Sequence, residues 1–354
     1  MERVKNIQNT LSEHKIDALL VTNMYNVRYL AKFTGTTGLI VITQDDAYFV
    51  TDFRYTEQAA EQAKGYSIVK NTGPIYNEVA EIVKNNDIET LGFEGDDITF
   101  STYEKINKLI DCDLKATTGI VEKLRQVKSE DEIKILQQAV DIAEKGYDYI
   151  LGYIKPGMTE IEVSNELDFY MRKLGAVGVS FDTIVASGVR SAMPHGVASD
   201  KVIEEGDMVT IDFGCYYEGY ASDMTRTFAV GDPGEELKEI YAIVQEANRR
   251  VTEAAKAGMT GAELDAIARD YISENGYGDE FGHTTGHGLG LEVHEGPAVS
   301  HRNDKKLVEN NVITNEPGIY VAGLGGVRIE DDLVIKEDGV LNLNSSSKEL
   351  IIID

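Results

Sequence analysis

The chain has 354 residues, of which 42% are hydrophobic and 27% are charged. This composition is typical of a compact globular protein and argues against a long disordered chain. The 61 acidic side chains outnumber the 34 basic ones, which gives a formal net charge of -27. The electrostatic field of the molecule therefore disfavours nucleic acid and anionic membrane surfaces, and we expect neither as a partner.

Cysteine use and the N-terminal residues indicate the compartment. Cys112 and Cys215 lie far apart in the chain, which argues against a disulfide framework and fits a reducing environment. The first residues carry charges without a following apolar core, and no apolar run is long enough to cross a bilayer. We expect a cytoplasmic protein.

The first third of the chain alternates short apolar runs with amphipathic stretches. Three runs predict strands and two stretches predict helices: residues 16–22, 38–42 and 47–53, then 56–63 and 76–85. This pattern predicts a small α/β domain, which we place at residues 1–122.

We place a second domain at residues 123–354 and predict that a long helix lies near its start. Ser129 and Glu132 have the spacing of a capping box, and apolar residues follow at helical spacing as far as Ile150. Both parts of the chain combine helices and strands, so the fold class is α/β or α+β.

An internal repeat with an offset of about 100 residues organises the second domain. Residues 155–159 read KPGMT and residues 256–260 read KAGMT, and each precedes a helix that a capping box would begin. Gly175 and Gly276 lie where left-handed residues would end these helices. Two related halves are therefore predicted.

The repeat continues into the strands that follow. The run GDMVTIDFG aligns with NNVITNEPG, which places Asp212 over Glu316, and Asp223 then falls near Glu330 with a few residues inserted. Each half would thus contribute two carboxylates from strands. We expect both pairs to meet at one shared site on a pseudo-twofold axis.

The carboxylates of the first half lie in an apolar setting. A buried carboxylate is unfavourable unless it is paired or bound to metal, so Asp212 within a strand is expected to have a partner or a bound cation. A tight loop at Tyr217 and Glu218 would place Asp223 directly across a hairpin from Asp212. Two such charges repel unless a cation lies between them. Two acids on a solvated edge strand are an equally good interpretation of this half alone.

The second half favours the metal interpretation. Glu316 and Glu330 each interrupt apolar β-like runs. His283, His287 and His294 occur within one short stretch among glycines, which allow the backbone to approach a ligand closely. A single histidine in such a place would more often be structural.

Four carboxylates and one imidazole form a set too rich in oxygen for a structural zinc site. They also exceed what one ion needs, so we expect two divalent metal ions that share carboxylates and activate a water molecule. Mn²⁺ fits this donor set best, with Co²⁺, Zn²⁺ and Fe²⁺ as alternatives.

At these residues the second domain resembles the pita-bread metallopeptidases, a family that includes prolidase, aminopeptidase P and methionine aminopeptidase. The resemblance covers about residues 129–354 and implies a pseudo-twofold catalytic domain. The metal ligands of the family are two Asp, one His and two Glu in this order, and they map onto Asp212, Asp223, His287, Glu316 and Glu330.

The resemblance also implies roles around the metals. His195, His283 and His294 would line the substrate side and stabilise the tetrahedral intermediate, with core packing as the alternative. Glu316 would in addition carry a proton from the water to the leaving nitrogen.

Two arginines accompany the predicted ligands. Arg328 precedes Glu330 by two residues and should share its face of the strand, near the metals or the substrate carboxylate. A structural salt bridge is the alternative for Arg328. For Arg226 we expect a structural role, with pairing inside the carboxylate cluster.

The N-terminal region looks like the smaller domain of prolidase and aminopeptidase P relatives. The resemblance therefore implies an enzyme that hydrolyses the bond between an N-terminal residue and proline in short proline-containing peptides. We expect it to be a homodimer. Whether the substrate is a dipeptide or a longer peptide stays open.

The alternatives are a catalytically silent binding protein, a metal-free hydrolase of the creatinase type and an aminopeptidase of other specificity. The sequence differs from the motifs common in the family at Met193 and at NNV before ITNEPG. Neither difference involves a proposed ligand, so only the fine specificity stays open.

Overall fold

The computed structural model describes residues 1–353. The chain forms two compact units, Met1–Arg125 and Gln126–Asp354. The boundary predicted after residue 122 falls inside the last helix of the first unit, Ile120–Arg125. Within residues 1–353, no helix combines the length and the apolar character that crossing a membrane requires.

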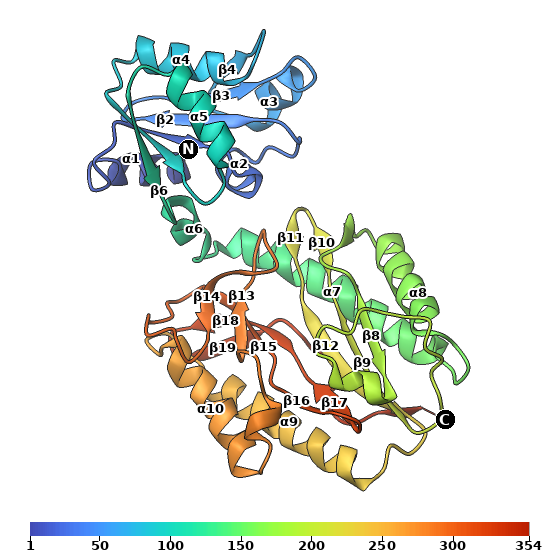
Figure 1. Ribbon diagram of the computed structural model, residues 1–354. Helices are drawn as coiled ribbons and strands as arrows, with labels where there is room; N and C mark the ends of the chain where they lie inside the picture. Colours follow the sequence, from blue (N-terminus) through green and yellow to red (C-terminus); the bar gives the residue numbers. More distant parts are fainter. Residues whose placement is uncertain (354) are drawn as a thin grey trace. The chain divides into compact units, whose positions relative to one another are not determined.

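The first unit is built on a six-stranded sheet of order β4-β3-β2-β1-β5-β6 (Figure 1). Its strands are β1 Ala18–Val21, β2 Leu39–Thr43, β3 Ala47–Thr51, β4 Ser67–Lys70, β5 Thr90–Glu94 and β6 Asp113–Thr117. Its helices are α1 Glu2–Thr10, α2 Met24–Ala31, α3 Thr56–Gln62, α4 Tyr76–Asn85, α5 Phe100–Leu109 and α6 Ile120–Arg125. The three strands and two helices predicted from the sequence are all present.

One core cluster of this unit lies between a face of the sheet and two helices. Leu20 and Val41 from the sheet are fully buried and pack in one cluster with Val79 of α4 and Ile106 of α5. The β-branched and aliphatic composition of β1 and β2 suits strands that are buried on both faces.

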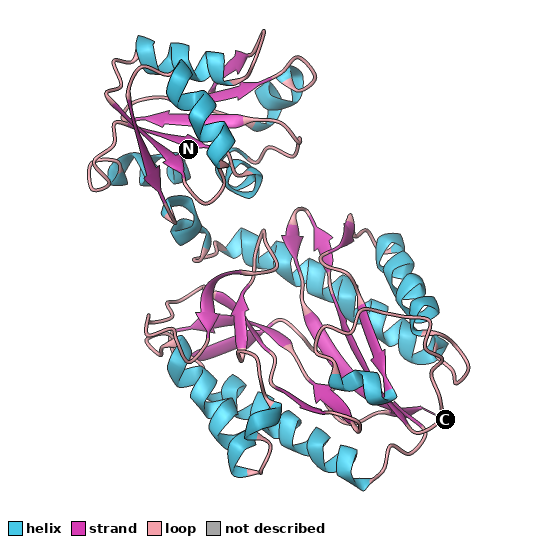
Figure 2. Ribbon diagram, viewed as in Figure 1, coloured by secondary structure: helices cyan, strands magenta, loops and turns pink. Residues whose placement is uncertain are grey.

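The second unit contains two halves with strands between outer helices (Figure 2). Its helices are α7 Glu130–Tyr153, α8 Glu160–Lys173, α9 Glu235–Ala254 and α10 Gly261–Glu274, with short 3-10 turns η1 Gly188–Ala192 and η2 Gly278–Glu280. The strands of the first half are β7 Gly178–Val179, β8 Ile184–Ser187, β9 Asp207–Phe213, β10 Cys215–Tyr217, β11 Tyr220–Ala221 and β12 Met224–Val230. Those of the second half are β13 Gly286–Gly288, β14 Glu295–Val299, β15 Val312–Asn315, β16 Gly318–Val321, β17 Gly325–Arg328, β18 Asp331–Lys336 and β19 Gly339–Asn342, and β20 Ile352–Ile353 returns to the first half beside β12.

Separate sheets carry the two halves. The first half has the order β20-β12-β9-β8, and the second half has the order β14-β13-β15-β18-β19. Helices α7 and α8 cover the first sheet, where Tyr147 and Leu167 pack with Ile211 and Phe228. In the second half Leu264 of α10 packs against β15 and β18. Burial of these apolar faces holds each sheet against its helices.

The predicted helix boundaries of the repeat are confirmed. Capping boxes formed by Ser129, Thr159 and Thr260 begin α7, α8 and α10, and in each the glutamate three residues later bonds back to the cap. Gly175 and Gly276 follow the ends of α8 and α10 with φ of 110° and 91°. A residue with a Cβ would be strained in that left-handed conformation, so glycine ends both helices.

The predicted register of the β9–β12 hairpin is wrong by two residues. Asp212 lies opposite Thr225, not opposite Asp223. The turn is centred on Glu218 and Gly219, with φ of 46° and 86°, one residue later than predicted, because the chain reverses where glycine tolerates positive φ. This error shifts the pairing by two residues, and since side chains alternate with a period of two, Asp223 stays on the face of Asp212.

Candidate metal and active site

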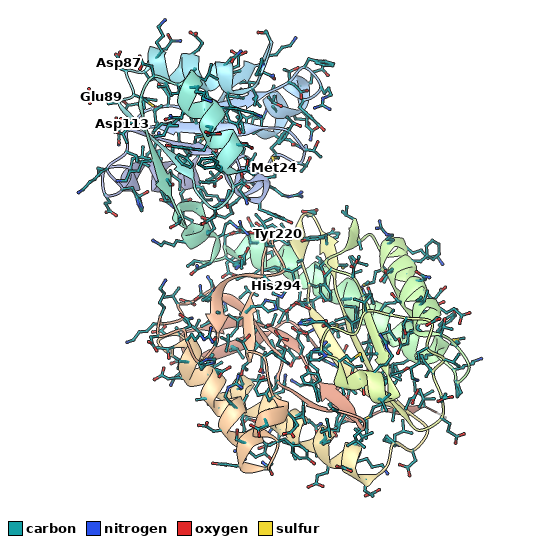
Figure 3. The ribbon with its side chains drawn as sticks, viewed as in Figure 1. Met24, Asp87, Glu89, Asp113, Tyr220 and His294 are labelled. Atoms are coloured by element: carbon teal, nitrogen blue, oxygen red, sulfur yellow. The ribbon has the colours of Figure 1, made fainter. Side chains whose placement is uncertain are left out.

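All the site residues predicted from the sequence line one pocket of about 480 Å³ in the second unit. They are Asp212, Asp223, His287, Glu316 and Glu330 as predicted ligands, His195, His283 and His294 as predicted substrate-side residues, and Arg328. His294 is labelled in Figure 3. The pocket has a volume suited to a short peptide.

The four carboxylates lie where strands begin or end. Asp212 is near the end of β9, and Asp223 directly precedes β12. In the second half Glu316 follows β15 and Glu330 precedes β18, beside the paired residues Asn315 and Asp331. Each half therefore contributes one carboxylate near the end of a strand, Asp212 or Glu316, and one just before a strand, Asp223 or Glu330, as the repeat predicted.

His287 lies among these carboxylates and breaks the symmetry of the two halves. Its Nε2 is 3.5 Å from Oδ2 of Asp223 and 3.4 Å from Oε1 of Glu316. One potential ligand atom each from Asp223, His287 and Glu330 lie within 4.8 Å of one another. Three donors at such separations can hold one metal ion, and Asp212 and Glu316 supply oxygens in the same pocket.

The protonation state of His287 suits a ligand. Its Nδ1 is 3.1 Å from the carbonyl oxygen of Gly288, a contact in which Nδ1–H donates and Nε2 keeps its lone pair towards the carboxylates. Burial, followed by the nearby His294, lowers the pKa of His287 to about 4. The imidazole is therefore neutral near pH 7, as metal ligation requires.

Burial and mutual repulsion disfavour the ionised form of these carboxylates. Burial and then the charge of Glu330 raise the pKa of Asp223 well above its usual range, and burial and then Glu316 do the same for Glu330. Burial raises the pKa of Glu316 to about 8. A cluster of this kind becomes favourable in its ionised form when cations compensate it.

Asp212 provides an independent test of whether the site fits a cation. Its Oδ2 accepts a hydrogen bond from Nη2 of Arg328 at 2.7 Å. Its Oδ1 is buried, and no hydrogen-bond donor within residues 1–353 reaches it. A buried carboxylate oxygen without a partner is costly. The donor set and this open oxygen both fit a divalent metal ion.

Arg328 makes the salt bridge that the sequence left as an alternative. Besides Asp212, its guanidinium donates from Nη1 to the hydroxyl oxygen of Tyr320 at 2.8 Å and from Nε to Oγ1 of Thr225 at 3.0 Å. Arg328 therefore lies beside Asp212, one of the predicted ligands. These contacts occupy all three nitrogens of the guanidinium.

Tyr320 was not predicted from the sequence. Its hydroxyl lies 2.8 Å from Nε2 of His283 and also contacts Arg328. Pairing of Gly318 with Arg328 in the β16–β17 hairpin places Tyr320 on the same face as the arginine. Only that register reveals the contact, so the run GIYV alone carries no usable signal.

The three substrate-side histidines differ in burial. His195 and His294 are exposed at the pocket, which argues against core packing for them. His283 is partly buried, and burial followed by the charge of Arg328 lowers its pKa to about 4. The sequence did not predict the apolar wall beside them, which consists of Phe181, Ile184, Val197 and Val293.

Arg226 forms a structural ion pair, but its partner is Asp331 and not one of the four predicted ligand carboxylates. Its Nη2 is 2.8 Å from Oδ1 of Asp331, and its Nη1 donates to the carbonyl oxygen of Glu330 at 2.6 Å. Asp331 also accepts from Lys348 at 2.6 Å. Burial would raise the pKa of Asp331, but Arg226 and Lys348 hold it below its usual value. This ion pair fixes the backbone beside the predicted ligand Glu330.

Both units match known protein families in sequence. A sequence model of the metallopeptidase family M24 matches residues 134–337, and one of the creatinase/prolidase N-terminal domain matches residues 3–127. The chain is 44% identical to a Xaa-Pro dipeptidase of Pyrococcus furiosus, with 99% of each chain covered.

Solved structures agree with this assignment. One described as a Xaa-Pro dipeptidase from Bacillus anthracis has 54% sequence identity and a TM-score of 0.99, with 100% of this chain and 99% of that chain covered. An X-Pro aminopeptidase from Thermotoga maritima has 43% identity and a TM-score of 0.91, with 97% and 99% covered. The predicted pita-bread fold of the second unit is confirmed. The chain belongs to the metallopeptidase family M24 and carries a creatinase/prolidase N-terminal domain.

Proposed function

We propose that the protein hydrolyses the peptide bond between an N-terminal residue and proline, with divalent metal ions held by the two Asp, one His and two Glu of the pocket. The observation that carries this proposal is the convergence of Asp223, His287 and Glu330 on one point, with Asp212 and Glu316 beside them. Relatives that align over nearly the whole chain are named Xaa-Pro dipeptidases and X-Pro aminopeptidases.

The ligand residues would hold two ions, as the count of carboxylates suggests. When bound, such ions supply Lewis acidity and lower the pKa of water. The mostly oxygen donor set supports Mn²⁺ as the metal, with Co²⁺, Zn²⁺ and Fe²⁺ as alternatives.

One ligand residue, Glu316, and the residues around the ligands perform the remaining steps. Glu316 accepts a proton from the attacking water at its carboxylate and delivers it to the proline nitrogen as the bond breaks. His195 and His294 donate hydrogen bonds to substrate oxygens, and those to the carbonyl oxygen strengthen as negative charge develops there. His283 lines the substrate side with its ring, whose Nδ1 and Nε2 contact the carbonyl oxygen of Thr284 and the hydroxyl of Tyr320. Arg328 keeps Asp212 in place through its ion pair.

The apolar wall of the pocket suits the substrate. Ile184, Val197 and Val293 present aliphatic side chains, and Phe181 adds an aromatic ring. Contact with these groups would remove a proline ring from water at little cost in polar interactions.

The test is hydrolysis of Ala-Pro and of Ala-Pro-Ala by protein loaded with manganese, together with elemental analysis of its metal content. We expect at least one of the two to be cleaved, with two metal ions per chain. Cleavage of Ala-Pro alone indicates a dipeptidase, and cleavage of Ala-Pro-Ala indicates an aminopeptidase. If metal-loaded protein cuts neither peptide, the proposal is wrong.

A catalytically silent binding protein is the alternative from another class. The complete ligand set argues against it, because such a protein has no need to keep four carboxylates together in one pocket. The same argument disfavours a metal-free hydrolase.

The compartment and the assembly stay predictions. Cys112 and Cys215 are free thiols, which supports a reducing, cytoplasmic environment. The homodimer is proposed from the family resemblance and is tested by sedimentation of the purified protein.

A further inference from the structure

Two of the substrate-side histidines lie in loops. His195 follows the turn η1, and His283 lies between η2 and β13. Both line the pocket. A ring carried by a loop keeps its position only if other contacts fix the backbone around it.

Arg269 of α10 holds the backbone around His283. Its Nη1 donates to the carbonyl oxygen of Phe281 at 2.9 Å, and its Nη2 donates to the carbonyl oxygen of His283 at 2.7 Å. Its guanidinium carbon lies 4.5 Å from the centroid of the Phe281 ring. The arginine therefore contacts the chain on both sides of Gly282.

Asp265 completes this arrangement from the preceding turn of α10. Its carboxylate is buried and forms a bidentate pair with Arg269, at 2.8 Å to Nε and 3.0 Å to Nη2. The same carboxylate accepts from the backbone N–H and the hydroxyl of Thr285, each at 3.0 Å. Arg269 and Asp265 thus hold the chain before and after His283.

The first half contains a similar arrangement around His195. Glu160, the first residue of α8, is fully buried. Its carboxylate accepts from the backbone N–H of Ser187 at 2.8 Å and from that of Ser199 at 3.1 Å. These serines lie on either side of the loop that carries His195.

Arg190 links this carboxylate to the loop itself. Its Nη1 pairs with Glu160, and its Nη2 donates to the carbonyl oxygen of Val197 at 3.0 Å, two residues after His195. Helices α8 and α10 are equivalent in the repeat, but the acids occupy different positions on them. The same kind of support is therefore built twice from unrelated sequence positions.

We propose that Arg190 and Arg269 are positioning residues, Arg190 for His195 and Arg269 for His283. Each arginine ties the loop of its histidine to a buried carboxylate, so that the imidazole meets the substrate without a search through loop conformations. This inference rests on the proposed function, in which both histidines line the substrate side.

Purely structural ion pairs are the competing explanation. Loss of such a pair lowers the free energy of unfolding, but its effect on turnover should not depend on which histidine is present. A positioning residue acts through one particular ring, so its effect disappears once that ring is removed.

The experiment is a set of double-mutant cycles on manganese-saturated enzyme. We expect Arg269→Lys, which keeps the charge but loses the planar fork, to lower kcat by about tenfold and to change KM little. In the His283→Ala background the same change should lower kcat by less than about twofold, whereas in the His195→Ala background it should keep its full effect.

Arg190→Lys provides the reciprocal cycle. Its effect on kcat should disappear in the His195→Ala background and persist in the His283→Ala background. The two mismatched double variants, Arg269→Lys with His195→Ala and Arg190→Lys with His283→Ala, are therefore the controls. Effects that persist equally in both backgrounds would overturn the positioning role and would leave the proposed function intact.

Hydrogen exchange gives a readout that does not require activity. Amides of residues 281–285 should exchange faster in Arg269→Lys than in the unaltered protein, with or without manganese. Arg249→Lys is the matched control, because Arg249 pairs with Glu246 and Glu253 of its own helix. Unchanged exchange in residues 281–285 would refute the positioning role of Arg269 even if the protein cut neither test peptide.

Discussion

Glu316 is the residue whose loss should be most damaging to catalysis. Glu316→Gln keeps the size of the side chain but removes the group that accepts and returns the proton, so kcat should fall by about 100-fold or more. Hydrolysis of the preferred test peptide and the thermal unfolding midpoint are the measurements. Glu309→Gln, at an exposed position, is the control and should be fully active. A fully active Glu316→Gln enzyme would eliminate this mechanism.

Glu94 shows how burial changes the acidity of a carboxyl far from the pocket. Its carboxyl accepts from the backbone N–H groups of Thr22 and Asn23, each at 2.7 Å. Burial outweighs these hydrogen bonds and raises the pKa from its ordinary value of 4.5 to about 7. Between these two values the folded protein keeps a proton that the unfolded chain has released.

Stability of the first unit should therefore fall as the pH rises from about 5 to about 7. The full contribution is about 3 kcal/mol, from about 1.4 kcal/mol for each unit of pKa change. Glu94→Gln cannot release a proton and should lack this loss. The denaturant midpoint of both proteins at pH 5 and pH 8 measures it, and a constant difference between the two proteins would contradict the prediction.

At the scale of elements, local signals identified the helices and strands that were predicted, but α1, α2, α5, α6 and α9 were not among them. The capping box of Ser129 and the apolar spacing after it predicted the start of α7, because both signals depend on residues within one helical turn. The hairpin of β9 and β12 was predicted as a hairpin but with the wrong register. Its turn depends on which residues adopt positive φ, and a shift of one residue in the turn moves every pair.

The first capping box can be tested directly. Ser129→Ala removes the acceptor for the backbone N–H of Glu132, 3.3 Å from the serine hydroxyl, and should lower the free energy of unfolding of the second unit by about 1 kcal/mol. Denaturant unfolding measures this change. Ser12→Ala, at an exposed position, should be neutral. An unaltered midpoint for Ser129→Ala would show that the cap contributes nothing.

At the scale of the whole molecule, the metal ions should also contribute to stability. Without cations, the buried carboxylates around Asp223 repel one another, and ligands that bind only the folded state raise its stability by mass action. A chelator should therefore abolish hydrolysis and lower the thermal unfolding midpoint, and added Mn²⁺ should restore both.

Asp223→Asn should make the unfolding midpoint much less sensitive to the chelator, since a principal ligand is gone. Asp338→Asn, at an exposed position, is the matched control and should respond as the unaltered protein does. Calorimetric titration with Mn²⁺ checks the affinity of each. An equal response of both variants to the chelator would argue that the ions bind elsewhere.

The sequence by itself determined the helices α3, α4, α7, α8 and α10, several strands, the repeat and the set of predicted ligands. These features depend on spacing within a few residues or on acids and histidines that are out of place in apolar runs. Carboxylates such as Asp212 and Glu316 could be paired across the halves because the repeat aligned them before any contact was known.

Only the tertiary structure decided which side chains touch. The contact between Tyr320 and His283, the ion pair of Arg328 with Asp212 and the support from Arg269 all join residues from different elements. Such contacts depend on strand register and on how helices pack against sheets. Both are set by burial of the whole core, and no short stretch of sequence contains that information.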